Sequence, residues 1–243
     1  LRLKLEQAAW GCRRIAWTLA RLGLKLSRTS VQRIVRRPPP SRRRRRNEPT
    51  GRNDPGLVAK RPGHVWLIDL TSVPRLLLGS LHVAAVVDLF SRKVMAIQVW
   101  AHVPTANDVR TLLLAAILRY GPVTWMVTDH GTQFVAKRFG RLLKRHRIRR
   151  RFGAVASSQS VAVIDRFWRS LKTEGIVGFF GFRSLAWVRH RLKVYQRWFN
   201  GERAHGGLGG ATPNEIHWRH TPAVRTPRLR IRHATLVRRD FAG

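Results

Sequence analysis

The sequence predicts an α/β fold, in which a mixed sheet is flanked by helices and preceded by an N-terminal helix-turn-helix arm. First, strand-like apolar runs open residues 61–220 and then alternate with segments of helical period. Second, a chain of 243 residues with 44% hydrophobic residues can bury a substantial core. Third, residues 1–37 have a basic, helical pattern. The order β-β-β-α-β-α-β-α-α is typical of a sheet covered by helices.

Residues 61–220 are expected to form the globular core. Strands are expected where short apolar runs are bounded by polar or turn-forming residues. Helices are expected where apolar residues recur three and four positions apart, and Thr105 is placed to cap the first of them. We expect strands at 64–70, 81–87, 94–100, 124–127 and 148–152, and helices at 105–120, 133–146, 160–174 and 184–200.

Residues 1–37 are expected to form two short helices. Ile15, Leu19 and Leu22 recur at helical spacing, Gly23 ends the pattern, and Ser27 is placed to cap the second helix. An outward basic face on that helix would suit phosphates and base edges, and the alternative is a helical hairpin with a solvated basic face. The candidate DNA-binding residues are Arg28, Gln32, Arg33, Arg36 and Arg37.

Residues 38–60 are expected to be a linker, and residues 221–243 a basic tail. Three prolines open the linker and cannot continue a helix. Five consecutive like charges follow and cannot pack, so beside DNA they would form a phosphate-binding strap, whereas elsewhere they would be a spacer or a nuclear-type address. The tail is either a small β-rich appendage or disordered. The chain begins with Leu, which fits a truncated N-terminus or an unusual start codon. The strap residues are Arg42, Arg43, Arg44, Arg45 and Arg46.

The charge of the chain predicts a polyanionic partner. Lys and Arg number 48, Asp and Glu number 12, and the net charge is +36. Such a charge repels itself in a compact fold and is tolerated beside nucleic acid. Arginine outnumbers lysine, and its guanidinium group can donate two hydrogen bonds to one phosphate. A GC-rich genome would also favour arginine, but it would not explain the shortage of acids.

The chain lacks the sequence patterns of secretion, membrane insertion and zinc binding. Cys12 is the single cysteine, so no intrachain disulfide can form. The most apolar stretch, 76–90, is too short and too often interrupted to span a bilayer, and no signal-peptide pattern opens the chain. The histidines do not show zinc-ligand spacing. We therefore expect a cytoplasmic protein without a membrane partner.

Three of the 12 acids occupy positions that suit a metal site. Asp69 ends the first predicted strand, where an unpaired carboxylate in an apolar run would be costly. Asp129 follows the fourth predicted strand, and α/β sheets bind ligands at the carboxyl ends of their strands. Asp165 lies in the first turns of the predicted helix 160–174.

These acids belong to a set of motifs that resembles the integrase core of insertion-sequence transposases and retroviral integrases, the DDE group with an RNase H-like fold. The resemblance covers about residues 8–220. In that family 35 residues separate the second and third acids, and 35 residues lie between Asp129 and Asp165. The motifs are Asp69-Leu70-Thr71, Val87-Asp88-Leu89-Phe90-Ser91-Arg92, the segment 128–134, the segment 166–172, and Asn200-Gly201-Glu202-Arg203-Ala204-His205 with Thr212-Pro213-Asn214-Glu215.

The resemblance implies a transposase that cleaves element ends and transfers them to target DNA. It assigns Asp69, Asp129 and Asp165 as catalytic acids and ligands of two Mg²⁺ or Mn²⁺ ions, with Asp69 bridging both. Water would first expose a 3′-hydroxyl at the element end, and that hydroxyl would then attack target DNA. Arg169 and Lys172 would contact the element's DNA end. The implied assembly is a homo-oligomer on DNA, associated with the nucleoid in a bacterial cytoplasm.

The site departs from the family pattern at the third acid. The family has glutamate where this chain has Asp165, and aspartate is one methylene shorter; an error of about 1 Å can cost roughly 100-fold in rate. Ser158-Gln159 also replaces the usual His-Gly pair. Glu174, nine residues further on, is expected on the opposite helix face and is no replacement. The alternative function is therefore a degenerate copy that binds DNA but is catalytically impaired.

Other residues near the expected site have structural interpretations. Asp88 is expected to support a Ser-Arg turn, the alternative being a neighbour of the first metal. His130 is expected to shape a turn with Gly131, the alternative being contact with DNA or a metal-bound water. Phe167 and Trp168 are expected to lie in the core.

Overall fold

A computed structural model describes residues 10–35, 57–75, 79–152, 158–175, 184–225 and 229–230. The strap arginines 42–46, most of the predicted linker and most of the predicted tail lie outside these residues. No helix in the described part of the chain is both long enough and apolar enough to cross a membrane.

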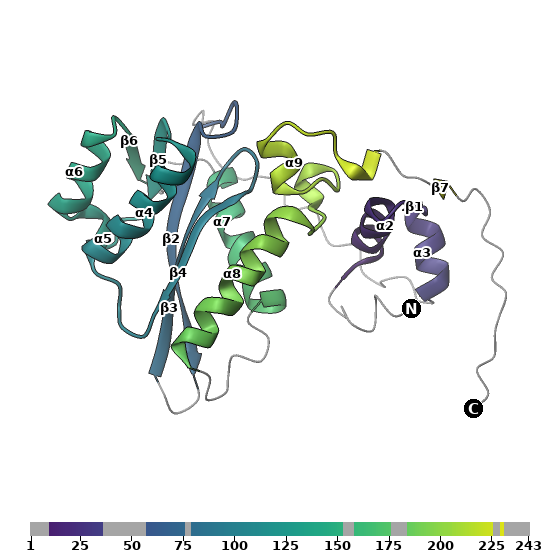
Figure 1. Cartoon of the computed structure of the whole chain (residues 1–243), viewed down its shortest axis with the longest axis horizontal. Helices are drawn as coiled ribbons and strands as arrows, with labels where there is room; N and C mark the ends of the chain where they lie inside the picture. Colours follow the sequence, from purple (N-terminus) through teal and green to yellow (C-terminus); the bar gives the residue numbers. More distant parts are fainter. Residues whose placement is uncertain are drawn as a thin grey trace.

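The core is a five-stranded mixed sheet, as the sequence predicts (Figure 1). The strand order is β4-β3-β2-β5-β6; β2, β3 and β4 pair antiparallel, whereas β5 and β6 run parallel to β2. The strands are β2 (Val65–Arg75), β3 (Gly79–Asp88), β4 (Val94–Trp100), β5 (Trp125–Thr128) and β6 (Arg149–Phe152). β2 continues five residues beyond the predicted strand because its hairpin pairing with β3 extends to Arg75 opposite Gly79.

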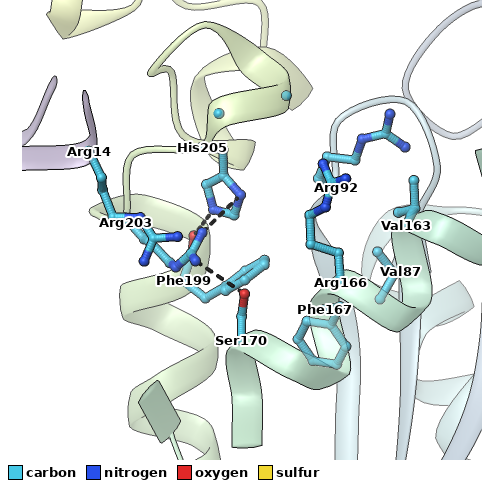
Figure 2. A pocket seen from close by; sticks show the side chains of 12 residues that line it. Arg14, Val87, Arg92, Val163, Arg166, Phe167, Ser170, Phe199, Arg203 and His205 are labelled. Atoms are coloured by element: carbon cyan, nitrogen blue, oxygen red, sulfur yellow. Dashed lines mark hydrogen bonds between the residues drawn. The ribbon is translucent and has the colours of Figure 1, made fainter. Parts of the chain in front are cut away.

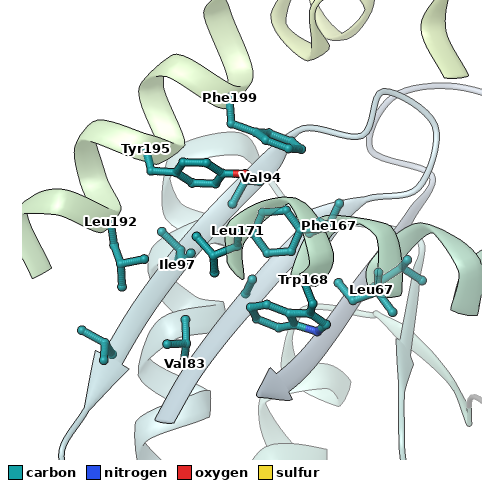
Figure 3. Packing of buried hydrophobic residues seen from close by; sticks show 14 of the residues in the cluster. Leu67, Val83, Val94, Ile97, Phe167, Trp168, Leu171, Leu192, Tyr195 and Phe199 are labelled. Carbon is teal, nitrogen blue, oxygen red and sulfur yellow. The ribbon is translucent and has the colours of Figure 1, made fainter. Parts of the chain in front are cut away.

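Helices cover both faces of the sheet (Figure 1). One apolar cluster lies under α4, α5 and α6 and includes Trp66, Phe134 and Phe139. The other lies under α7 and α8 and includes Leu67 and Phe167 (Figure 3). Burial on both faces explains why the strands read as continuous apolar runs. The helices are α4 (Ala106–Tyr120), α5 (Thr132–Val135), α6 (Lys137–Arg145), α7 (Ser158–Ser170) and α8 (Leu185–Gly201), with a π-helical turn, η2 (Leu171–Gly175), after α7.

The prediction of a single helix at 133–146 is wrong, because the helix is interrupted at Ala136. This residue has an extended conformation, with φ −55° and ψ 139°, and separates α5 from α6. Phe134 and Phe139 are both fully buried and their rings meet edge to face at 5.5 Å. Residues five apart in one α-helix point about 140° away from each other. The break lets both rings enter the same core.

The N-terminal arm consists of α2 (Cys12–Arg21) and α3 (Arg28–Val35), with the short strand β1 (Leu24–Lys25) between them. Ser27 caps α3 as expected, because its Oγ accepts from the Ser30 N–H at 3.0 Å. The arm packs on the core near α8, where Trp10 stacks on Trp198 with ring centroids 6.3 Å apart. β1 also pairs with β7 (Leu229–Arg230), and the short helix α9 (Pro213–His217) follows α8.

Candidate functional site

Strand pairing brings two of the predicted acids to neighbouring positions. β2 and β5 run parallel, and Leu67 lies opposite Val127. Asp69 and Asp129 each follow two residues later, so the same register, continued, places them side by side at the end of β5. Residues two apart in a strand share a face. Leu67 and Val127 belong to the apolar cluster under α7, so both acids are directed toward that helix.

α7 contributes Asp165 to the same region. The helix is anchored by its buried face, which carries Ile164, Phe167 and Trp168 and packs against the sheet (Figure 3). Asp165 itself is exposed. The charges of Asp129 and Asp165 both act on the Asp69 carboxyl group. The three predicted acids are therefore electrostatic neighbours although they come from three separate elements.

Two hydrogen-bond donors hold the half-buried carboxylate of Asp69. Trp168 donates from Nε1 to Oδ2 at 2.7 Å, and the Leu70 backbone N–H donates to Oδ1 at 2.8 Å. Burial raises the pKa of Asp69 above its ordinary value; the two hydrogen bonds oppose this effect, and the charges of Asp129 and Asp165 add to it. The region therefore has an excess of negative charge that a divalent cation would compensate.

The chemical type of the ligand atoms in the three acids fits a divalent cation. All three side chains offer carboxylate oxygens, the ligands that Mg²⁺ and Mn²⁺ prefer. Asp129 uses Oδ1 to accept from the Gly131 N–H at 2.9 Å, and each bonded oxygen keeps a second lone pair. Within the described residues, no three His, Cys, Asp or Glu side chains yet lie close enough together to hold a metal ion. Binding would thus require the carboxylates to move closer to one another.

The predicted DNA-binding residues lie on the surface where the structure describes them. Arg169 on α7 and Lys172 on η2 are exposed, on the helix that carries Asp165. On α3, Arg28 and Arg33 are exposed and Gln32 is partly buried. The structure does not bring the arm residues to the acidic site.

The structural interpretation of Asp88 agrees with its contacts. Asp88 is fully buried and accepts hydrogen bonds from the Gly63 N–H, the Ser91 N–H and the Ser91 hydroxyl, each at 2.7 Å. These bonds close the turn between β3 and β4. His130 is exposed and stacks on Phe152 at 4.2 Å, while the Asp129 side chain stabilises the turn at Gly131.

Glu174 makes contacts that exclude it as the third acid. It lies in the π-helical turn rather than in a continuous α-helix, so the rotation assumed from the sequence does not apply. Its carboxylate accepts from Arg203 Nε at 2.6 Å and also from Arg14 of the arm. Both arginines hold it on the arm side of the core.

Trp168 has a polar role that its sequence pattern does not predict. It is buried as expected, but its indole N–H binds Asp69. The available signal was its spacing, since a residue three positions after Asp165 lies on the same side of a helix.

Comparison with known proteins gives matches over the core. Two family models, both described as integrase core domain, match residues 59–158 and 146–213. The transposase for insertion sequence element IS904 of Lactococcus lactis is 26% identical over 163 residues, which are 65% of this chain and 62% of that relative. The putative transposase for insertion sequence element IS150 of Escherichia coli is 25% identical over 224 residues, 86% of this chain and 78% of that relative. The chain thus spans less than two thirds of the length of the first relative.

A solved structure agrees with the fold. The catalytic core domain of BIV integrase superposes with a TM-score of 0.52 at 26% identity, covering 65% of this chain and 95% of that domain. The two family models overlap and together cover more than half of this chain, including Asp69, Asp129 and Asp165. The mixed sheet with helices on both faces is the RNase H-like arrangement expected from the resemblance. This chain belongs to the integrase core domain family.

Proposed function

We propose that this chain is the transposase of an insertion element, which cleaves DNA at the element's ends and joins them to target DNA. The observation that carries the proposal is the placement of Asp69, Asp129 and Asp165 by β2, β5 and α7 of an integrase core. The names of the relatives support it, because they are transposases of insertion sequence elements. The net charge of +36 supports a DNA partner.

The three acids are proposed to hold two Mg²⁺ or Mn²⁺ ions, since the integrase core family depends on divalent metal. Such a pair supplies activation of the attacking oxygen and stabilisation of the leaving oxygen. Trp168 and Leu70 hold the Asp69 carboxylate, so the approach that metal binding requires falls mainly to the exposed Asp129 and Asp165. Arg169 and Lys172, exposed on the same helical segment as Asp165, are proposed to contact the element's DNA end.

The arm is proposed to bind DNA through Arg28, Gln32 and Arg33. The strap arginines 42–46 are proposed to contact DNA phosphates. Transposition must hold two element ends together, so a homo-oligomer on DNA is part of the proposal.

A binding protein without useful catalysis is the second candidate, and the aspartate at position 165 favours it. The exposed side chain of Asp165 is one methylene shorter than glutamate on a helix that is anchored by buried residues. If α7 stays in place, this carboxylate falls about 1 Å short of a metal held by the other two acids, which can cost roughly 100-fold in rate.

Nicking of a duplex that carries the element ends, with Mg²⁺ or Mn²⁺, tests both candidates. The unchanged chain is compared with Asp69→Asn, Asp165→Glu and the control Glu202→Gln, whose side chain is exposed. We expect metal-dependent nicking that Asp69→Asn abolishes, that Asp165→Glu increases by up to about 100-fold and that Glu202→Gln leaves unchanged. Nicking only by Asp165→Glu would identify an impaired copy. Nicking that survives Asp69→Asn would overturn the proposed site.

A further inference from the structure

A pocket opens beside α7 (Figure 2). Its lining includes Arg166, the residue that follows Asp165. Its α7 residues are Val163, Arg166, Phe167 and Ser170, which recur at one helical stripe. The opposite wall comes from the segment after α8, with Arg203 and His205. The cavity volume of about 250 Å³ is below the roughly 300–1,000 Å³ typical of small-molecule sites, so a single phosphate group fits it better than a whole nucleotide.

The pocket is lined by four arginines, and no acid is among its lining residues. Glu174 lies behind the wall and binds Arg14 and Arg203. Arg92 and Arg166 form no ion pair with any carboxylate in the described part of the chain. Burial lowers the pKa of Arg92, and the nearby charge of Arg166 lowers it further against the opposing effect of Asp88. Within the described residues, these two guanidinium groups therefore lie near each other with no carboxylate at ion-pair distance, and only the more distant charge of Asp88 opposes their repulsion.

The wall opposite Arg166 is held in a fixed arrangement. Arg203 donates from Nη2 to Ser170 Oγ at 3.1 Å, and its Nη1 lies 3.4 Å from His205 Nδ1. The buried His205 ring also lies with Nε2 3.1 Å from the Phe199 carbonyl oxygen. Burial lowers the pKa of His205 to about 3, with Arg203 contributing, so the ring is neutral and donates from Nε2 while Nδ1 accepts. Arg203 is thereby positioned before any ligand arrives.

We propose that this pocket binds one backbone phosphate of the DNA that lies across the three acids, with Arg92 and Arg166 as its main ligands. The inference rests on the proposed function, because it assumes a DNA strand at Asp165. Arg166 is the next residue after Asp165, so the pocket and the acid lie within about one helix diameter, ~10 Å. Guanidinium groups bind phosphate oxygens through paired donors, and a single phosphate would relieve the repulsion between the two arginines.

The test is the salt dependence of duplex DNA binding by the full chain. The double variant Arg92→Asn/Arg166→Ala removes both ligands, and asparagine tolerates the left-handed backbone of Arg92, whose φ is 64°. The matched control is Arg189→Ala/Lys193→Ala, which removes two exposed charges from α8. Arg189 lies ten residues before Phe199, or about 15 Å along the helix axis.

We expect the slope of log binding constant against log salt to become shallower by about 0.9 in the double variant, the loss of one phosphate contact, and to stay unchanged in the control. Thermal unfolding of both variants confirms that they are folded. Equal slopes in the double variant and the unchanged chain would overturn the proposal that the pocket binds a DNA phosphate. The proposed function, which nicking tests, would be unaffected. If the slope becomes equally shallow in the control variant, the proposal is also overturned, because the change in slope would then follow from the loss of net charge alone.

A second experiment, with inorganic phosphate, distinguishes a pocket that binds a DNA phosphate from one that binds a free anion. Thermal stabilisation by phosphate is measured for the unchanged chain and for the double variant. If the variant loses this stabilisation but keeps its DNA salt slope, the pocket takes a free anion and the DNA assignment is wrong. If the unchanged chain shows no salt-dependent DNA binding, the proposed function fails and this inference fails with it.

Discussion

The Asp69 carboxylate is in an unfavourable environment when no cation is bound. It is half-buried at the end of an apolar strand segment, and Asp129 and Asp165 add like charge. The hydrogen bonds from Trp168 and Leu70 offset part of this cost. The unfavourable environment comes first from burial, to which the charges of Asp129 and Asp165 add, whereas the structural acid Asp88 is surrounded by donors.

Replacing Asp69 by asparagine is therefore expected to stabilise the metal-free chain near neutral pH. A carboxyl group whose pKa is raised in the folded state destabilises the fold at any pH above that raised pKa. The penalty fades as the pH falls and is absent below the unfolded value, about 3.8. Urea unfolding with a chelator should thus show Asp69→Asn to be more stable at neutral pH, with the difference vanishing below about pH 4.

Asp108→Asn serves as a control with the opposite sign. Burial raises the pKa of Asp108, but the hydrogen bonds from Thr105 at the start of α4 outweigh burial and lower it. This variant should lose stability near neutral pH. An Asp69→Asn variant that is also less stable than the unchanged chain at neutral pH would contradict the raised pKa of Asp69.

The positions of the three acids could be predicted from the sequence, but their contacts could not. Asp69 and Asp129 end predicted strands, and a fixed spacing leads to Asp165. The indole donor of Trp168 was missed because an apolar helix stripe predicts burial and gives no direction for a ring N–H. The pairing of Arg92 with Arg166 was missed because these residues are 74 positions apart and meet only through the fold.

Glu174 joins three separate elements at the junction of the arm and the core. It lies in the π-helical turn after α7 and binds Arg14 of α2 and Arg203, which follows α8. The side chains of Glu174 and Arg203 are only 6% and 5% exposed. Burial raises the pKa of Glu174, but the hydrogen bonds and charges of Arg203 and Arg14 together outweigh burial and lower it. The ion pairs therefore stabilise the folded state when Glu174 is ionised.

Glu174→Gln is expected to reduce the free energy of unfolding by about 3–5 kcal/mol near neutral pH, because it leaves Arg203 buried without its carboxylate. A lowered pKa gives stability that is present above the unfolded value, about 4.5, and is lost as the pH falls through the folded pKa. The difference from the unchanged chain should therefore shrink in acid. Urea unfolding measures it.

Limited proteolysis of the arm extends the same test. If Glu174 anchors α2, Glu174→Gln should speed trypsin cleavage within the arm, whereas Glu202→Gln, with an exposed side chain, should not. Equal stability and equal cleavage in the two variants would show that the stacking of Trp10 on Trp198 is enough to hold the arm.

Element order was predictable because hydrophobic period distinguishes strands from helices over long segments. The strand at 94–100 has the predicted bounds, and the N-caps at Thr105 and Ser27 are present. The break at Ala136 was not predictable, since the segment keeps helical composition and its extended conformation follows from packing of Phe134 and Phe139. The π-helical turn was not predictable either, and its residue Glu174 binds partners that are far away in the sequence.

Over the whole molecule, the net charge of +36 opposes the compact fold. Several carboxylates that the structure describes, such as those of Glu174, Glu215 and Asp88, are already engaged in hydrogen bonds or ion pairs within the protein. With 48 Lys and Arg against 12 Asp and Glu, the carboxylates can offset only a part of the positive charge. Bound DNA would neutralise the remaining positive charge, so the free chain is expected to be less stable than its DNA complex.

Added salt should consequently stabilise the free chain. Raising NaCl from about 0.1 M to about 1 M shortens the screening length from about 10 Å to about 3 Å, which weakens repulsion between surface arginines. Each kcal/mol of repulsion removed is expected to raise the Tm by about 2–4 °C in a chain of this size. Differential scanning calorimetry in NaCl, with sucrose of equal osmolality as the control, measures the rise.

At low salt, duplex DNA should raise the Tm as well, whereas at high salt its effect should disappear because counterion release no longer favours binding. A Tm that falls with NaCl would mean that attractive ion pairs, such as those of Arg21 with Glu215 and Arg203 with Glu174, outweigh the repulsion of the whole charge.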